Sequence, residues 1–193
     1  MNKLKDLLFG VRLEAVQGDT DLPITSVAFD SRKVKEGGLF VAIKGDVFDG
    51  HDYIQKAIGL GAIAIVCENK PKNASEDVLW VTSSNSREAL AIIASNFYDT
   101  PSSKLKLIGV TGTNGKTTVS TLLYRLFEKA GYASGLLSTI AIKYNSADIP
   151  ATHTTPDSLQ INAHLNTMVE AGVAYCFMEV SSHGIDQDRI KGL

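Results

Sequence analysis

The stretch Leu107-Ile108-Gly109-Val110-Thr111-Gly112-Thr113-Asn114-Gly115-Lys116-Thr117-Thr118 decides the predicted fold. Its apolar beginning is typical of a buried strand, and a tight loop with two glycines follows. After the loop, Gly131 stands where a glycine commonly ends a helix. The apolar residues between them recur at helical spacing and predict one buried face: Val119, Leu122, Leu123, Leu126, Phe127 and Ala130. A strand, a glycine loop, Lys-Thr and a helix in this order indicate a phosphate-binding loop.

The residue types of this loop suit a bound phosphate. Gly112 and Gly115 allow the backbone to turn its N–H groups toward one anion, and the helix N-terminus adds the positive end of its dipole. Lys116 can reach the outer phosphates, and the Thr117 hydroxyl can ligate Mg²⁺. Val110 stands where the common pattern has a glycine, so an ordinary turn with a chance Gly-Lys-Thr is the alternative. The pattern favours a nucleoside triphosphate without saying what the phosphate is used for.

Composition excludes several classes of protein. The chain has 193 residues and a formal net charge of −2, which suits one or two globular domains and gives no electrostatic argument for a nucleic acid partner. No stretch approaches the ~20 apolar residues of a membrane span, and the N-terminus is too polar for a secretory signal. Cys67 and Cys176 each lie in an apolar run. We therefore expect buried free thiols and a cytoplasmic protein.

Residues 1–100 predict a small α/β unit. The expected strands are 24–29, 39–43, 62–67 and 78–81, and the expected helices are one that ends at Gly10, one over 51–59, and one that Asn85 and Glu88 open as a capping pair. The run at 62–67 is continuously apolar, as in a strand that is covered on both faces. Residues 100–103, Thr-Pro-Ser-Ser, indicate a linker to a second unit.

The second unit alternates strands and helices. After the phosphate-loop helix we expect a strand at 135–139, irregular structure over 140–153, a helix that Thr155 caps and Gly172 ends, and a strand at 173–180. This order predicts a parallel sheet with helices on its faces. Three strands leave such a layer unfinished, so we interpret the chain as the N-terminal fragment of a longer protein. We expect it to be catalytically inactive alone and to self-associate through an apolar strand edge at 173–180.

Ligands of parallel sheets bind beyond the carboxyl ends of the strands, and three such ends are polar here. They are the phosphate loop, residues 152–157 and residues 179–183. Glu179 stands inside an otherwise apolar strand, and a buried carboxylate needs a cation partner. It is a candidate Mg²⁺ ligand beside Thr117. A structural salt bridge and a solvent-facing strand position are the alternatives.

Three more residues near the C-terminus are candidates. His183 suits a second metal ligand or a hydrogen-bond donor to phosphate, although an exposed loop histidine is more often neither. Gln187 and Arg189 suit an anionic substrate, but a solvated charged loop has the same composition.

Taken together, these passages resemble the Mur ligase family, and within it the MurE branch. The resemblance covers nearly the whole chain. Its passages are Thr111 to Thr118, Asp30-Ser31-Arg32-Lys33-Val34, Gly38 to Ala42, Gly45 through Asp49-Gly50, Thr154-Thr155-Pro156-Asp157, and Met178 to His183 with Gln187 and Arg189. The first passage has the form of the family's ATP loop, which explains why Val110 stands where the common pattern has a glycine. The last two passages resemble MurE and not MurF.

The resemblance implies ATP-driven amide ligation with ATP and Mg²⁺. The free carboxylate of UDP-MurNAc-L-Ala-D-Glu takes the γ-phosphoryl group of ATP to give an acyl phosphate, which the amine of a diamino acid, L-lysine or meso-diaminopimelate, then attacks. Residues 1–100 become a UDP-MurNAc-binding domain and residues 101–193 the first part of the central ATP-binding domain. The carbamylated lysine and the C-terminal domain of the family lie beyond Leu193. We expect the full-length protein to be monomeric.

The resemblance also implies roles for single residues. The catalytic residues are Lys116, Glu179 and His183, and the metal residues are Thr117, Glu179 and His183. The ATP-binding residues are Gly112, Thr113, Asn114, Gly115, Lys116, Thr117 and Thr118. The substrate-binding residues are Phe29, Ser31, Asp46, Val47, Phe48, Thr154, Thr155, Ser181, Gln187 and Arg189. His153 stands where some relatives have an asparagine.

Other functions compete with this interpretation. A MurF-type or folylpolyglutamate-type ligase of the same superfamily is the nearest, and residues 154–157 and 181–183 argue against both. A phosphotransferase kinase shares only the phosphate loop. For the fragment, a nucleotide-sugar binding module without turnover is the alternative from another class.

Overall fold

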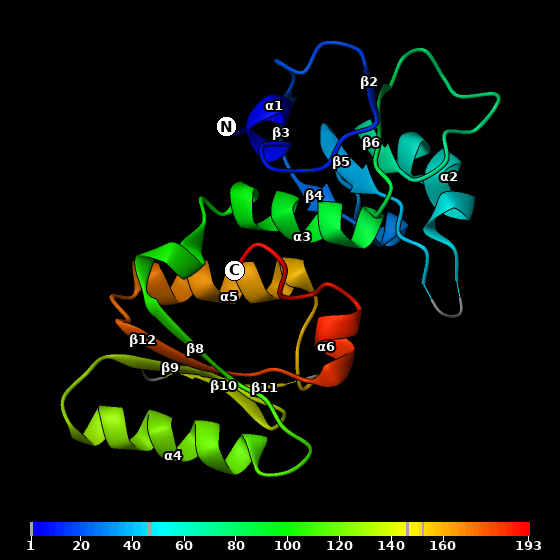
Figure 1. Ribbon diagram of the computed structural model, residues 1–193. Helices are drawn as coiled ribbons and strands as arrows, with labels where there is room; N and C mark the ends of the chain where they lie inside the picture. Colours follow the sequence, from blue (N-terminus) through cyan, green and yellow to red (C-terminus); the bar gives the residue numbers. More distant parts are fainter. Residues whose placement is uncertain (1, 46–47, 146, 152) are drawn as a thin grey trace. The chain divides into compact units, whose positions relative to one another are not determined.

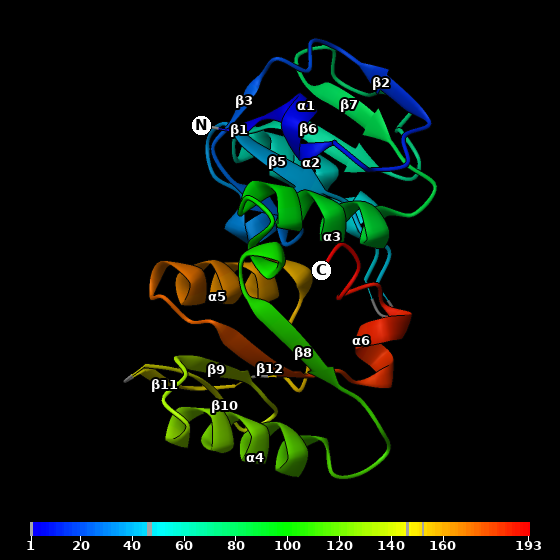
Figure 2. The same ribbon diagram turned by 60° about the vertical axis from the view of Figure 1, so that its left-hand side comes forward.

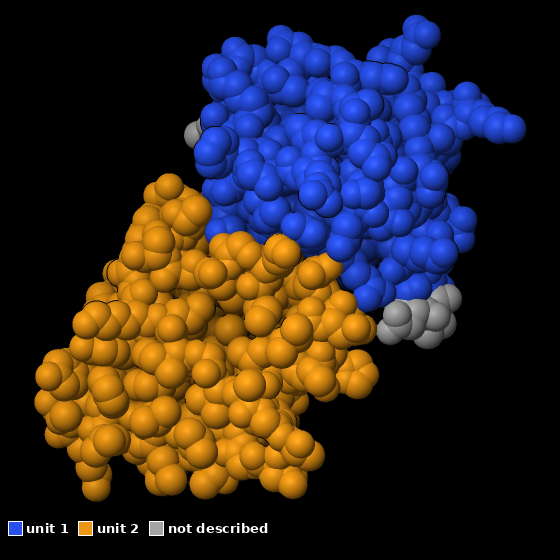
Figure 3. Space-filling model, viewed as in Figure 1, with its two compact units in different colours: residues 1–97 blue, residues 98–193 orange. Residues whose placement is uncertain are grey.

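A computed structural model describes residues 2–45, 48–145, 147–151 and 153–193 (Figure 1). The chain divides into two compact units, residues 1–97 and 98–193, which Figure 3 colours separately. The expected linker at 100–103 is instead largely a 3₁₀ helix, Pro101–Lys104, inside the second unit. None of the described helices is long and apolar enough to cross a membrane.

The first unit contains a five-stranded sheet in the order β2-β7-β6-β5-β4. Four strands are parallel, and the edge strand β2 runs antiparallel to β7. The strands are β2 (Ala15–Gln17), β4 (Val27–Ala28), β5 (Gly38–Val41), β6 (Ala62–Cys67) and β7 (Leu79–Thr82), with a separate pair β1 (Asn2–Lys3) and β3 (Pro23–Ile24). The expected strand at 24–29 is therefore two strands, because residues 23–24 pair with β1 whereas 27–28 pair with β5.

Both faces of this sheet are covered. Phe40, Ile65 and Trp80 pack with Ile54 and Ala57 of α2 on one face. The alternate residues of β5 and β6 point to the other face and are fully buried as well. The helices are α1 (Leu4–Leu7), α2 (Ile54–Gly59) and α3 (Ser86–Phe97), with a 3₁₀ turn at Gly50–Tyr53. The prediction of a doubly covered strand at 62–67 is confirmed, and so is the cap of α3, where Asn85 Oδ1 accepts the N–H of residue 88.

The second unit contains a five-stranded sheet in the order β11-β10-β9-β12-β8. Three strands are parallel: β8 (Lys106–Val110), β9 (Ser134–Leu137) and β12 (Tyr175–Glu179). The region expected to be irregular is an antiparallel hairpin of β10 (Ala141–Tyr144) and β11 (Ala147–Pro150). Periodicity missed it because β11 is mostly exposed and has no buried alternation.

The position of β12 overturns the prediction of an open edge at 173–180. β12 pairs with β8 on one side and with β9 on the other, and four of its five residues are buried. Among the described strands of this sheet, the edges are β8 and β11. The crossover through α5 inserts the last strand between the first two, and local sequence does not encode that choice.

The helices α4 (Lys116–Lys129) and α5 (Ser158–Glu170) lie on opposite faces of this sheet (Figures 1 and 2). Ile161, Leu165 and Met168 of α5 pack with Leu137 and Cys176. Both helices end at a glycine with positive φ, Gly131 at +86° and Gly172 at +76°, as predicted.

The buried face of α4 differs from the predicted one. Val119, Leu122 and Leu126 are 46, 59 and 60% exposed. Ser120 is fully buried instead, and the Phe127 ring packs against the ring of Tyr175 on β12, with 4.8 Å between centroids. The helix carries apolar residues on more than one side, so their spacing alone does not select the face that meets the sheet.

Candidate functional site

The phosphate loop lies between the end of β8 and the start of α4, as the sequence predicts. Gly112 and Gly115 have φ values of +143° and +81°, which L side chains rarely adopt. A Cβ on Gly115 would meet nothing within 4 Å, and one on Gly112 would meet only the Asn114 carbonyl oxygen at 3.6 Å. The two glycines are therefore needed for the backbone path, and the space beside the loop is open to a ligand.

The lysine of the loop is the first residue of α4. Lys116 Nζ donates a hydrogen bond of 2.7 Å to the Gly112 carbonyl oxygen, so its ammonium group lies over the loop. Val110, the departure from the common pattern, is the last residue of β8 and pairs with Glu179 on β12. A strand residue with a side chain fits this position because the loop turns only after it.

Glu179 is the most unusual side chain of the second unit, because its carboxylate is fully buried. Oε2 accepts hydrogen bonds from Thr117 Oγ1 at 3.0 Å and from Thr139 Oγ1 at 3.1 Å, and Oε1 accepts one from the Thr139 backbone N–H at 2.9 Å. No cation within the described ranges forms an ion pair with it. Both alternatives, a salt bridge and a solvent-facing position, are therefore wrong. Three neutral donors satisfy the carboxylate.

The donors around Glu179 fit Mg²⁺. A threonine hydroxyl and a carboxylate are hard oxygen ligands, and Mg²⁺ usually takes one or two carboxylates together with phosphate oxygens and water. Across the described part of the chain, no group of three or more His, Cys, Asp or Glu side chains could hold a metal by itself. Thr117 and Glu179 would hold the ion only together with a nucleotide. His183 is exposed in α6 (Ser182–Asp186) and belongs to no such group.

The predicted substrate residues of the second unit are mostly brought together. Thr155 is 1% exposed; its Oγ1 donates to the Glu179 carbonyl oxygen at 3.0 Å and accepts the Ser181 N–H at 2.9 Å. Arg189 Nη1 donates to the Thr155 carbonyl oxygen at 2.5 Å, and its Nη2 donates to Gln187 Oε1 at 2.6 Å. These polar groups therefore bond to one another, and through Thr155 they hold the backbone at the end of β12 in place.

The start of α5 corrects one prediction about this cluster. Asp157 is the N-cap of α5, because its Oδ1 accepts the Gln160 N–H at 2.9 Å. Thr155 does not cap the helix, since its hydroxyl is engaged with β12. Thr154 is half-buried and His153 is exposed.

The first unit has a cavity of about 420 Å³. It includes three of the predicted substrate residues, Phe29, Ser31 and Phe48, whereas Asp46 and Val47 lie outside the described residues. Among the described residues, the lining consists of Phe29, Asp30, Ser31, Arg32, Phe40, Ile43, Gly45, Phe48, Gly50, Tyr53 and Lys56. The lining therefore combines aromatic rings, a buried hydroxyl and two cations.

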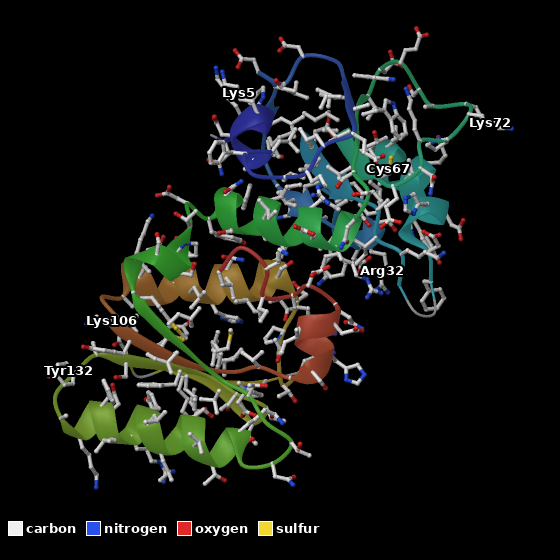
Figure 4. The ribbon with its side chains drawn as sticks, viewed as in Figure 1. Lys5, Arg32, Cys67, Lys72, Lys106 and Tyr132 are labelled. Carbon is white, nitrogen blue, oxygen red and sulfur yellow. The ribbon has the colours of Figure 1, made fainter. Side chains whose placement is uncertain are left out.

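One wall of the cavity is held by an arginine–aspartate pair. Arg32, labelled in Figure 4, donates from Nη2 to Asp30 Oδ2 at 2.8 Å and from Nε to Asp30 Oδ1 at 3.0 Å. These hydrogen bonds hold the pKa of Asp30 below its ordinary value. Asp30 also accepts the Arg32 backbone N–H, which closes the turn that carries Ser31.

Sequence reasoning missed the residues that anchor the loop beside the cavity. His51 Nδ1 lies 2.6 Å from Asp49 Oδ1, and its Nε2 accepts the Glu68 N–H at 3.0 Å, which assigns the proton of the neutral ring to Nδ1. His51 follows this loop, and at the residue before the loop Arg87 Nη2 donates to the Lys44 carbonyl oxygen at 2.8 Å. The only signal in the sequence was a histidine directly after Asp-Gly at the start of a helix.

Comparisons with known proteins agree with both units. The description "Mur ligase family, catalytic domain" matches residues 23–98, and "Mur ligase middle domain" matches residues 110–193. The proteins named UDP-N-acetylmuramoyl-L-alanyl-D-glutamate–2,6-diaminopimelate ligase from Cytophaga hutchinsonii and Phocaeicola vulgatus are 53% and 46% identical over 192 and 191 residues, 99% of this chain in each case. The chain spans 40% of the length of each of these two relatives.

Solved structures share the fold. A structure of a UDP-N-acetylmuramoyl-L-alanyl-D-glutamate–2,6-diaminopimelate ligase aligns over 100% of this chain and 38% of its own, with a TM-score of 0.79 and 24% identity. MurF ligase from Thermotoga maritima in complex with ADP aligns over 85% of this chain and 34% of its own, with a TM-score of 0.53 and 28% identity.

Proposed function

The chain belongs to the Mur ligase family, and from this premise we propose that its protein is an ATP-dependent ligase that joins a diamino acid to UDP-MurNAc-L-Ala-D-Glu. The observation that carries the proposal is the hydrogen bond from Thr117 Oγ1 to the buried carboxylate of Glu179. It joins the phosphate loop to a second group that suits the Mg²⁺ of a nucleotide.

The proposed reaction has two steps. The free carboxylate of the substrate attacks the γ-phosphorus of ATP, which forms an acyl phosphate and releases ADP. The amine then attacks the acyl carbon, the carbon–oxygen bond to phosphate breaks, and an amide, phosphate and a proton result. Lys116 neutralises charge on the transferred group from its place over the loop. Thr117 and Glu179 would hold Mg²⁺, which would further neutralise the phosphate oxygens when bound.

The nucleotide-sugar is proposed to bind in the cavity of the first unit. Phe29 and Phe48 provide aromatic faces for a base, and Ser31, which is 6% exposed, provides a hydroxyl inside the cavity. Arg32 and Lys56 place two cations on the lining, where they can attract a diphosphate. ATP and nucleotide-sugars of this kind are cytoplasmic metabolites, so we also propose a cytoplasmic location.

We propose 2,6-diaminopimelate as the diamino acid, in preference to L-lysine. Two relatives that are 53% and 46% identical to the chain are named for this substrate. Neither of these two relatives is named as a MurF-type or folylpolyglutamate-type ligase.

The experiment supplies the full-length protein with ATP, Mg²⁺, UDP-MurNAc-L-Ala-D-Glu and either diamino acid. We expect phosphate release and a product whose mass increases by one diaminopimelate residue. Lys116→Ala should abolish both signals, whereas Lys129→Ala, at the exposed end of the same helix, should retain them. Phosphate release without amide formation would contradict the ligase assignment.

A second function is favoured for the 193-residue chain alone. The described residues that line the cavity all lie within 29–56, which supports nucleotide-sugar binding by the first unit alone. This chain would then act as a binding module without turnover.

A further inference from the structure

Thr139 makes two of the three hydrogen bonds that hold the Glu179 carboxylate. It lies two residues after the end of β9, and β9 pairs in parallel with β12 so that Leu137 lies opposite Met178. This register carries the residues after β9 alongside the end of β12. The contact is therefore set by the sheet and links two residues that are 40 apart in the chain.

The turn that carries Thr139 is held tightly. The Ser138 N–H donates to the Ala141 carbonyl oxygen at 3.1 Å, and Ser138 Oγ donates to the same oxygen at 2.8 Å. Ser138 is 2% exposed, and the next strand, β10, continues from Ala141. Such a closed turn leaves Thr139 little freedom to move its backbone N–H away from Glu179.

Thr139 itself is exposed, yet its polar atoms are directed to a fully buried carboxylate. An exposed threonine hydroxyl has water as an alternative partner, so its bond to Glu179 is not forced by burial. A hydrogen bond to a charged acceptor is roughly twice as strong as a neutral one, which explains the preference.

The two oxygen atoms of Glu179 are held differently. Among the described residues, Oε1 accepts the Thr139 N–H, whereas Oε2 accepts the hydroxyls of Thr139 and Thr117. The backbone bond on Oε1 and the Thr139 hydroxyl bond on Oε2 together set the rotation of the carboxylate and direct Oε2 toward Thr117 in the first turn of α4. We propose that Thr139 is a positioning residue for the Mg²⁺–nucleotide, because it fixes the carboxylate of Glu179 toward Thr117. This inference rests on the proposed function.

The first test measures ADP binding to the chain by calorimetry, with Mg²⁺ and with a chelator. Thr139→Val removes the hydroxyl and keeps the shape, and we expect the gain in ADP affinity that Mg²⁺ provides to fall about tenfold. Affinity for ADP without Mg²⁺ should stay unchanged. Thr139→Ser should restore the gain. Thr167→Val removes an exposed hydroxyl that donates to the Ala163 carbonyl oxygen within α5. This control variant should behave as the wild type.

The second test needs no ligand. In urea unfolding of the whole chain, followed by amide hydrogen exchange in β12, Thr139→Val should raise the unfolding equilibrium constant about tenfold, the effect of losing one hydrogen bond to a charged group. With Glu179→Gln already present, the same change should raise it only about threefold, because the acceptor is then neutral.

The outcomes separate the two proposals. Equal Mg²⁺ dependence in Thr139→Val and the wild type, or equal effects of the change in both backgrounds of the unfolding experiment, overturns the role of Thr139. A wild-type chain that binds no ADP under either condition counts against the proposed function of the phosphate loop. In that case the unfolding experiment still decides whether Thr139 holds Glu179.

Discussion

Replacing Thr155 by valine distinguishes a supporting role of this residue from the substrate contact that its motif predicts. Valine has nearly the shape of threonine, so the change removes the hydroxyl and leaves the packing. In the structure Thr155 is 1% exposed, and its Oγ1 bonds both the Glu179 carbonyl oxygen and the Ser181 N–H. A residue that binds only substrate would change affinity without changing stability.

The magnitude follows from the two backbone groups that lose their partner. A buried donor or acceptor left without a hydrogen bond costs about 1–3 kcal/mol, so the two groups together should lower the free energy of unfolding by ~2–6 kcal/mol. That is a large share of the ~5–15 kcal/mol that stabilises a typical domain. Thr155→Ser keeps the hydroxyl and should recover most of the loss.

The assay is amide hydrogen exchange across β12 and the start of α6, which reports on the second unit alone. The free energy of the opening that exposes the amides of residues 175–181 to exchange should fall by the same amount. Thr167→Val serves as the control, because its exposed hydroxyl bonds only within α5; it should change stability by less than ~0.5 kcal/mol. A loss below that value for Thr155→Val would refute the supporting role.

Four further predictions concern the phosphate loop and the cavity. In the full-length protein, Lys116→Ala should abolish ligation, measured as phosphate release, while Lys129→Ala leaves it intact; turnover in the first variant would remove Lys116 from the site. Glu179→Gln should raise the Mg²⁺ concentration for half-maximal activity about tenfold, and an unchanged titration would show that the carboxylate serves the fold only. Residues 1–97 should fold alone, as circular dichroism would show, and bind UDP-MurNAc-peptide in calorimetry. His51→Ala should weaken that binding through the loop stem; binding that is absent in a folded wild-type unit would place the site elsewhere.

The phosphate loop and the local elements could be read from the sequence because short-range chemistry determines them. The loop and the helix ends need glycines where φ is positive. Gly112 and Gly115 in the loop, and Gly131 and Gly172 after the two helices, all have positive φ values. The apolar runs that contain Cys67 and Cys176 became buried strands with free thiols. A strand, a loop or a helix end depends on neighbours within a few residues, and those neighbours are adjacent in the sequence.

Only the tertiary structure decided which elements meet. β12 inserted between β8 and β9, and α4 turned Leu122 and Leu126 outward, because burial depends on pairings between distant segments. The partners of Glu179 show the same limit. The apolar strand around Glu179 favoured a buried carboxylate, but the sheet register brought Thr139 to it across 40 positions. A continuous apolar run indicates that a strand is buried, whereas the identity of its neighbours is set by hydrogen bonding between strands that the chain order leaves open.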